Sequence, residues 1–79
     1  MNNYAVVGIG IAQYTMTLGE AIKAAHDHAK GCRKQGGYSN ANIYAAHDVL
    51  DCNGSPYIPN GDNPAPIMTA GMIEESLRG

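Results

Sequence analysis

The sequence contains neither tryptophan nor phenylalanine, and its five tyrosines are the only aromatic residues. Apolar residues make up 44% of the 79 positions, but many of them are alanines, which remove little surface from water. Because a chain of this length buries a modest share of its surface on folding, its core must be thin. We expect one domain over residues 1–79, with a core supplemented by a second copy of the chain or by a partner protein.

Long apolar runs are also missing, and we expect no charged leader. The apolar segment from Tyr4 to Ala12 is too short to span a bilayer, and Met1-Asn2-Asn3 carries no charged side chain. The two cysteines, Cys32 and Cys52, are typical of a reducing compartment, in which a disulfide between them is disfavoured. These absences predict a cytoplasmic protein that does not contact membranes.

Charge of neither sign dominates, since the formal net charge is −2, but the two signs separate along the chain. Before Gly37 four basic residues outnumber Glu20 and Asp27, whereas from Gly37 onward only Arg78 accompanies five acidic residues. An acidic half suits a basic protein partner and disfavours direct binding of nucleic acid. The five acidic residues are Asp48, Asp51, Asp62, Glu74 and Glu75.

The stretch from Thr17 to Gln35 predicts the main helix, because start signal, apolar period and stop signal agree there. Thr17 and Glu20 have the spacing of a capping box, and Gly36 with Gly37 can close the helix in the left-handed conformation. Lysine and arginine on the outer side are expected to form an ordinary solvated face. The apolar stripe consists of Leu18, Ala21, Ile22, Ala25, Ala29 and Cys32.

Two strands are expected to lie under this helix. Tyr4–Ala12 is rich in β-branched residues, and Ile43–Leu50 alternates along its length. Strand, helix and strand in this order favour a right-handed crossover between parallel neighbours. Asn53-Gly54 then predicts a hairpin turn into an edge strand over Ser55–Pro59, and Ile67–Leu77 has the spacing of a short second helix. The expected fold is a small α+β domain of order β-α-β-β-α, with one main helix packed on a short mixed sheet.

No catalytic or cofactor-binding motif is complete. Gly8-Ile9-Gly10 lacks the third glycine of a dinucleotide fingerprint, and no nucleophile is set in a local signature. A structural zinc site requires four converging ligands, and the chain has no C-x-x-C. We expect no enzyme activity, metal or cofactor. The alternative, a small metal protein or enzyme, would use His28, Cys32, His47 and Cys52.

The tyrosines are the most informative feature for function, because tyrosine serves where one end of a side chain is apolar and the other is wet. Tyrosine is also enriched among the residues that dominate binding energy at protein interfaces. The alternative is that these rings only cover the margins of a small core. The predicted partner-binding residues are Tyr38, Tyr44, Asp48, Asp51, Tyr57, Asp62, Glu74 and Glu75.

The segments T-L-G-E-A-I-K-A-A-H-D-H-A and N-I-Y-A-A-H-D-V-L-D-C-N-G, following a strand, resemble compact β-α-β-β proteins of bacteriophage accessory genes. In size and plainness the chain is similar to anti-CRISPR proteins, over Tyr4 to about Pro59. The resemblance implies a stoichiometric phage inhibitor that docks on a host nucleic-acid-binding complex, such as a CRISPR-Cas surveillance complex, and blocks DNA binding. A homodimeric structural module is the other non-catalytic alternative.

Overall fold

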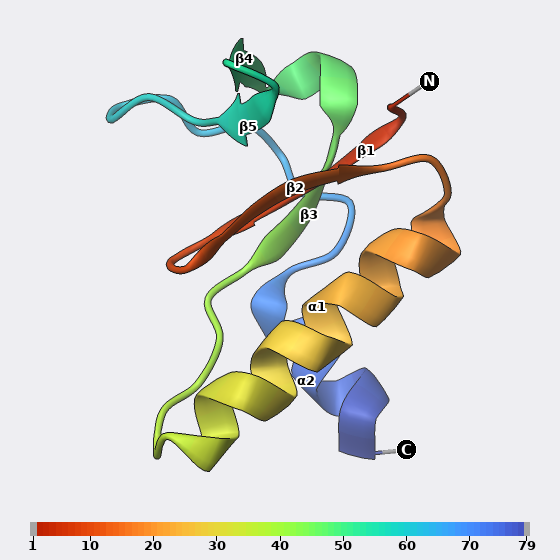
Figure 1. The fold of residues 1–79 in the computed structure, drawn as a ribbon, viewed down its shortest axis with the longest axis vertical. Helices are drawn as coiled ribbons and strands as arrows, with labels where there is room; N and C mark the ends of the chain where they lie inside the picture. The colour runs from red at the N-terminus through yellow and green to blue at the C-terminus, as the bar shows by residue number, and fades with distance from the viewer. Residues whose placement is uncertain (1, 79) are drawn as a thin grey trace.

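Helix α1 spans Leu18–Lys34 and crosses one face of a three-stranded sheet in a computed structural model that describes residues 2–78 (Figure 1). The Thr17 hydroxyl accepts the Glu20 N–H at 3.1 Å, and the Glu20 carboxylate accepts the Thr17 N–H at 3.1 Å. The predicted capping box and the predicted helix are therefore confirmed. Three alanines on the buried stripe let the helix approach the sheet closely, namely Ala21, Ala25 and Ala29.

The sheet has the order β2-β1-β3, and both strand pairs are antiparallel. Its strands are β1 (Tyr4–Gly8), β2 (Ile11–Thr15) and β3 (Asn42–Ala45). The prediction of one strand over Tyr4–Ala12 is wrong, because the chain reverses at Ile9 and Gly10, where Gly10 has φ +86°. Gly10 thus serves a turn rather than close packing.

This reversal also corrects the expected strand directions. Strand β2, which leads into α1, runs parallel to β3, but β1 lies between them, so the predicted parallel neighbours do not form. The element order is β-β-α-β-β-β-α rather than β-α-β-β-α, and the sheet is antiparallel rather than mixed. The α+β class and the single main helix on a small sheet are confirmed.

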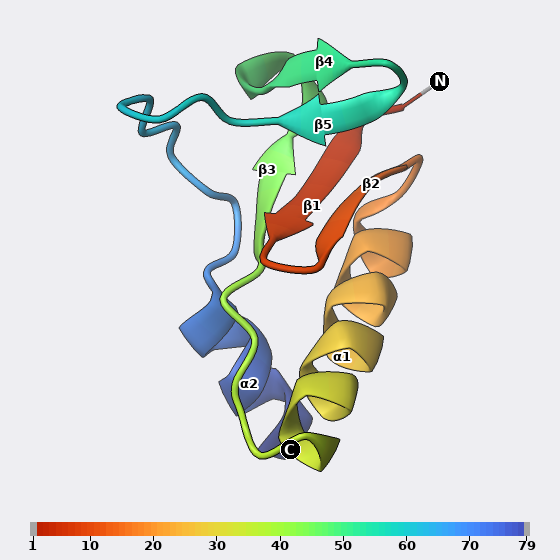
Figure 2. The ribbon, with the colours of Figure 1, turned by 60° about the vertical axis from the view of Figure 1, so that its left-hand side comes forward.

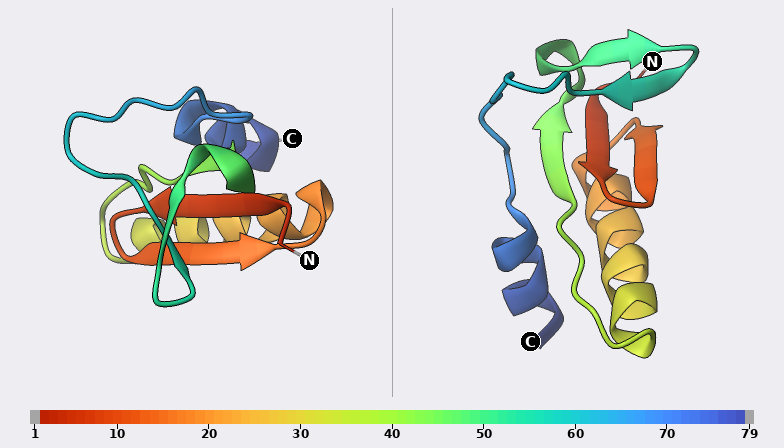
Figure 3. Two further views of the ribbon diagram at one scale, coloured as in Figure 1. Left: turned by 90° about the horizontal axis from the view of Figure 1, so that it is seen from above. Right: turned by 90° about the vertical axis from the view of Figure 1, so that its left-hand side faces the viewer.

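A second, two-stranded sheet consists of β4 (Leu50–Cys52) and β5 (Ser55–Tyr57). It lies across one end of the main sheet, where β5 contacts β2 and β1 (Figures 2 and 3). The predicted strand Ile43–Leu50 is interrupted after Ala45 by the 3-10 turn Ala46–Asp48, which sends the chain out of the main sheet. The Asn-Gly hairpin between the two short strands is confirmed.

Helix α2 (Ala70–Arg78) packs on α1, and its Ile73 joins the core cluster with Ile43 and Val6. It begins later than the predicted helix from Ile67, because residues just before it pair with the sheet. The Ile43 N–H donates to the Met68 carbonyl at 2.9 Å, and the Ile67 N–H donates to the Ile43 carbonyl at 2.7 Å. These bonds cover the outer edge of β3. Among the described residues neither helix is long and apolar enough to cross a bilayer.

The core is thin, as the composition predicts. Its largest fully buried side chains are Ile43 and Val6, and the remainder is mainly alanine with Ile73 from α2. Gly8 lets the chain before β3 come close, because a Cβ at this position would lie 2.6 Å from the Ala41 Cα. Close approach of backbones thus compensates for small side chains in this core.

Candidate functional site

The β4–β5 hairpin carries the surface on which most of the predicted partner-binding residues gather. Asn53 and Gly54 form its turn with φ of 52° and 87°, the positive values that a two-residue hairpin turn of type I′ requires. The turn fixes the register, in which Leu50 faces Tyr57 and Asp51 faces Pro56. Because side chains alternate along a strand, Leu50 and Tyr57 share one face of the hairpin and Asp51 and Pro56 the other.

Asp51 and Pro56 hold the hairpin to the main sheet. Pro56 is buried, and the Tyr14 hydroxyl of β2 donates to Asp51 Oδ1 at 2.8 Å. The other carboxylate oxygen of Asp51 accepts the Gly54 N–H at 3.2 Å, which supports the turn. The hydrogen bond to Asp51, together with partial desolvation and the negative charge, raises the pKa of Tyr14 above 10.0. Asp51 thus has a structural role in addition to its charge.

The opposite face of the hairpin is exposed and apolar in its middle. Leu50 is 54% exposed and Tyr57 is 48% exposed. A small hollow of about 80 Å³ joins them to Asp48 and Asp62, and among the described residues no lysine or arginine lines it. We call Asp48, Leu50, Tyr57 and Asp62 the hairpin surface. It combines an apolar centre with carboxylates at its rim, the usual anatomy of a protein-binding patch.

The remaining predicted residues lie elsewhere. Tyr44 is buried in the core, where its hydroxyl accepts a hydrogen bond from the Asn42 side chain at 3.0 Å. Tyr38 is exposed next to the C-terminal end of α1, with the Arg33 guanidinium 5.9 Å from its ring centroid. Glu74 forms an ion pair with Arg33 between the helices, and Glu75 is exposed on α2.

The eight predicted residues therefore do not form one surface. The structure brings together Asp48, Asp51, Tyr57 and Asp62 at the hairpin. Helix α2 and the C-terminal end of α1 lie at the opposite end of the molecule (Figures 1 and 3). The acidic residues of the second half of the sequence are thus divided between two ends of the fold. Asp48, Asp51 and Asp62 lie at the hairpin end, and Glu74 and Glu75 lie on α2 at the other end.

Histidine and cysteine come together at one place only within the described part of the chain. His28 and Cys32 are adjacent on α1, with the sulfur 3.8 Å from His28 Nε2, and His28 Nδ1 lies 2.8 Å from the Ser39 hydroxyl. His47 and Cys52 lie far along the chain in the 3-10 turn and the hairpin. Among residues 2–78 no group of three histidine, cysteine or acidic side chains has the geometry of a metal site.

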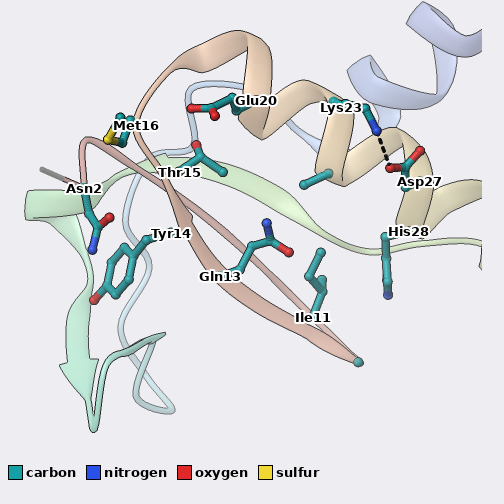
Figure 4. A pocket seen from close by; sticks show the side chains of 12 residues that line it. Asn2, Ile11, Gln13, Tyr14, Thr15, Met16, Glu20, Lys23, Asp27 and His28 are labelled. Carbon is teal, nitrogen blue, oxygen red and sulfur yellow. Dashed lines mark hydrogen bonds and ion pairs between the residues drawn. The ribbon is translucent and has the colours of Figure 1, made fainter.

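An open groove of about 810 Å³ lies between β2 and α1 (Figure 4). Ile11 and Gln13 of β2 point into it, whereas Tyr14 points away toward the hairpin (Figure 4). From α1 the groove is lined at helical spacing by Glu20, Lys23, Ala24, Asp27 and His28. One side of the groove is therefore the edge strand β2, and the other side is the mostly polar face of α1.

Two features of these surfaces, Leu50 and the groove, were not predicted from the sequence. The sequence predicts Leu50 as the last residue of the strand Ile43–Leu50 and not as a binding residue, although the Asn-Gly turn and strand alternation place it opposite Tyr57. The groove depends on β2 being a separate strand, and no local pattern in the apolar run from Tyr4 to Ala12 distinguishes the reversal at Ile9-Gly10 from a continuous strand.

Comparisons with known proteins gave no match: no family model, no curated protein and no solved structure matches this chain significantly.

Proposed function

We propose that this protein is a non-catalytic binding protein that docks its hairpin surface on a basic region of a larger partner. The observation that carries the proposal is the exposed pair of Leu50 and Tyr57, which face each other across the hairpin between Asp48 and Asp62. Large apolar side chains clustered within a charged rim are typical of interface centres, and a tyrosine among them is typical of a hot spot.

The charge of the hairpin surface indicates the kind of partner. Carboxylates at a rim steer association with lysine and arginine and speed the encounter. Basic surfaces that hold phosphates present such lysine and arginine side chains, because nucleic-acid binding depends on phosphate neutralisation. A protein that covers such a basic surface competes with DNA without catalysing a reaction and without needing a cofactor.

The resemblance to small phage proteins specifies this proposal further. We propose as the partner a host nucleic-acid-binding complex of the CRISPR-Cas surveillance type, and as the outcome an anti-CRISPR inhibition of DNA binding in the cytoplasm. We also propose that the chain associates with a second copy of itself, because a core whose largest fully buried side chains among residues 2–78 are Ile43 and Val6 gains from additional buried surface.

The test is a competition experiment with a purified surveillance complex and its target DNA duplex. We expect the wild-type protein to displace the duplex at a stoichiometric ratio. The double variant Asp48→Lys with Asp62→Lys should lose at least about tenfold in affinity, because like charges then face the basic partner. Asp51 is left intact in this variant, since its bonds to Tyr14 and Gly54 hold the hairpin in place.

Glu75→Lys provides the matched control, because it reverses an exposed carboxylate on α2, away from the hairpin. It should compete as the wild-type protein does. Equal loss in the control and in the hairpin variant would show a general charge effect and would contradict the proposed surface. Failure of the wild-type protein to bind the complex would reject the proposed partner.

A further inference from the structure

Strand β2 leaves one edge of the main sheet open. Among residues 2–78, β1 is the only strand paired with β2, whereas the outer edge of β3 is covered by Ile67 and Met68. Natural sheets protect such edges with charged side chains, prolines or bulges. The five residues of β2, Ile11–Thr15, include no charged residue and no proline. The edge therefore retains the backbone groups that another strand can pair with.

We propose that this edge pairs with β2 of a second copy of the chain, in an antiparallel arrangement about a two-fold axis at Gln13. Closed two-fold symmetry is the commonest arrangement of homo-oligomers, and it occupies both edges at once. The two three-stranded sheets then form one continuous sheet. Gln13 faces the second copy's Gln13, and each Tyr14 faces an alanine, Ala12, with no like charges opposite each other along the strand.

The apolar side chains at the two ends of β2 complement each other under this symmetry. Ile9 in the turn before β2 is 80% exposed, and Met16 after it is 55% exposed. They lie at nearly equal distances from Gln13 along the chain, four residues before it and three after it. A two-fold axis at Gln13 therefore brings Ile9 of one copy beside Met16 of the other, and both lose exposed apolar surface.

The charges on the groove side of α1 are self-complementary in the same arrangement. His28 is level with the β1–β2 turn, since a Cβ on Gly10 would lie 3.5 Å from its Nε2, whereas Glu20 lies at the start of the helix. The middle of the helix stripe, halfway between Glu20 and His28, is thus level with the middle of β2 (Figure 4). Reversal about this point places each Lys23 level with position 25 of the other copy, two residues from that copy's Asp27 and within reach of a lysine side chain.

The same reversal sets Glu20 opposite His28 of the second copy, where the carboxylate can accept the ring N–H. Within one chain Lys23 and Asp27 already form an exposed ion pair at 3.1 Å, so self-association extends two pairs into a network of four charges. Leu50 and Tyr57 of the hairpin surface lie on the face of the β4–β5 hairpin opposite the one that bonds to β2, so they stay available to the proposed partner. The inference rests on the self-association proposed above and is independent of the hairpin surface.

Disulfide trapping tests the interface directly. Residues opposite each other on antiparallel strands have Cα atoms about 4.5–5.5 Å apart, within the range that a disulfide bridges. We expect Gln13→Cys, in a chain with Cys32→Ser and Cys52→Ser, to oxidise to a covalent dimer with unchanged circular dichroism. Gln35→Cys in the same background is the matched control, because Gln35 is exposed at the far end of α1, and it should remain mainly monomeric.

Sedimentation equilibrium separates the interface from self-association itself. We expect the wild-type protein to have twice the mass of the 8.3 kDa chain, and Lys23→Glu to weaken the dimer at least about tenfold through like charges across the axis. Exchange of the pair, Lys23→Asp with Asp27→Lys, should restore it. A wild-type dimer in which Gln13→Cys oxidises no faster than Gln35→Cys would overturn this interface while leaving self-association intact. A wild-type monomer at high micromolar concentration would overturn both, and neither result affects the hairpin proposal.

Discussion

Small side chains determine how closely the layers of this molecule approach one another. Gly8 is the clearest case, because the Ala41 Cα, N and Cβ would lie within 2.8 Å of a Cβ added to it. Backbone atoms occupy this space, so no rotation of a flexible side chain can relieve the clash. Gly31 on α1 is the opposite case, with no atom within 4 Å of an added Cβ.

This contrast gives a paired prediction for two glycine-to-alanine substitutions. Gly8→Ala should lower the free energy of unfolding by about 1–3 kcal/mol, because it overpacks the contact with Ala41. Gly31→Ala should raise it by up to about 1 kcal/mol, because alanine loses less entropy in a helix. Urea denaturation followed by circular dichroism measures both values. A neutral Gly8→Ala would show that the chain before β3 is not held against β1.

The hydrogen bond between Tyr14 and Asp51 gives a pH-dependent prediction. The pKa of Tyr14 is raised above 10.0 in the folded state, so the folded protein keeps the proton at a pH where the unfolded chain loses it. The resulting stabilisation is complete below pH 10.0 and is lost as the pH rises through the raised pKa.

A titration of the Tyr14 ring by NMR measures this effect. Asp51→Asn should move the pKa of Tyr14 back toward 10.0, because the charge and the carboxylate acceptor are lost together. Asp62→Asn serves as the control and should leave the titration unchanged. If the pKa of Tyr14 were the same in the wild-type protein and in Asp51→Asn, the hydrogen bond from Tyr14 to Asp51 would not hold the hairpin to β2.

At the scale of elements, local signals determine α1 and the hairpin. The capping box at Thr17 predicts that Thr17→Ala costs about 1 kcal/mol of unfolding free energy, because the Glu20 N–H loses its acceptor. Thr17→Ser keeps a hydroxyl and should cost much less. Chemical denaturation of the two variants provides the comparison, and an equal loss in both would mean that the hydroxyl does not cap the helix.

Some of these elements could be predicted from the sequence, and the first hairpin could not. Helix α1, the Asn53-Gly54 turn and α2 follow from spacing and turn chemistry within a few residues, so they were predictable. The reversal at Ile9-Gly10 lies inside an apolar run, in which a continuous buried strand and a tight hairpin share one pattern. Only the pairing of β1 with both β2 and β3 distinguishes them, and such pairing is non-local.

At the scale of the whole molecule, prediction of the surface depends on the path of the chain. Asp48, Asp51, Tyr57 and Asp62 are close in sequence, and the short hairpin keeps them together. Glu74 and Glu75 have the same charge, but α2 returns to α1 at the other end, where Glu74 pairs with Arg33. Charge counted along a sequence identifies acidic residues without placing them on one surface.

Self-association gives a prediction for the stability of the whole molecule. If the β2 edges pair, the midpoint of thermal unfolding rises with protein concentration, because a dimer that binds only folded chains shifts the equilibrium by mass action. Lys23→Glu should make the midpoint independent of concentration over the same range. Calorimetry at several concentrations measures it, and a constant midpoint for the wild-type protein would speak against the dimer.

We propose that the protein acts through its hairpin surface. Hydrogen–deuterium exchange of the chain, alone and bound to a purified surveillance complex, tests it most directly, since a bound interface slows amide exchange. We expect new protection over residues 47–62, which include the hairpin and the loop of Asp62, and little change over α2. Protection confined to α2 and the end of α1, with residues 47–62 exchanging as in the free protein, would contradict it.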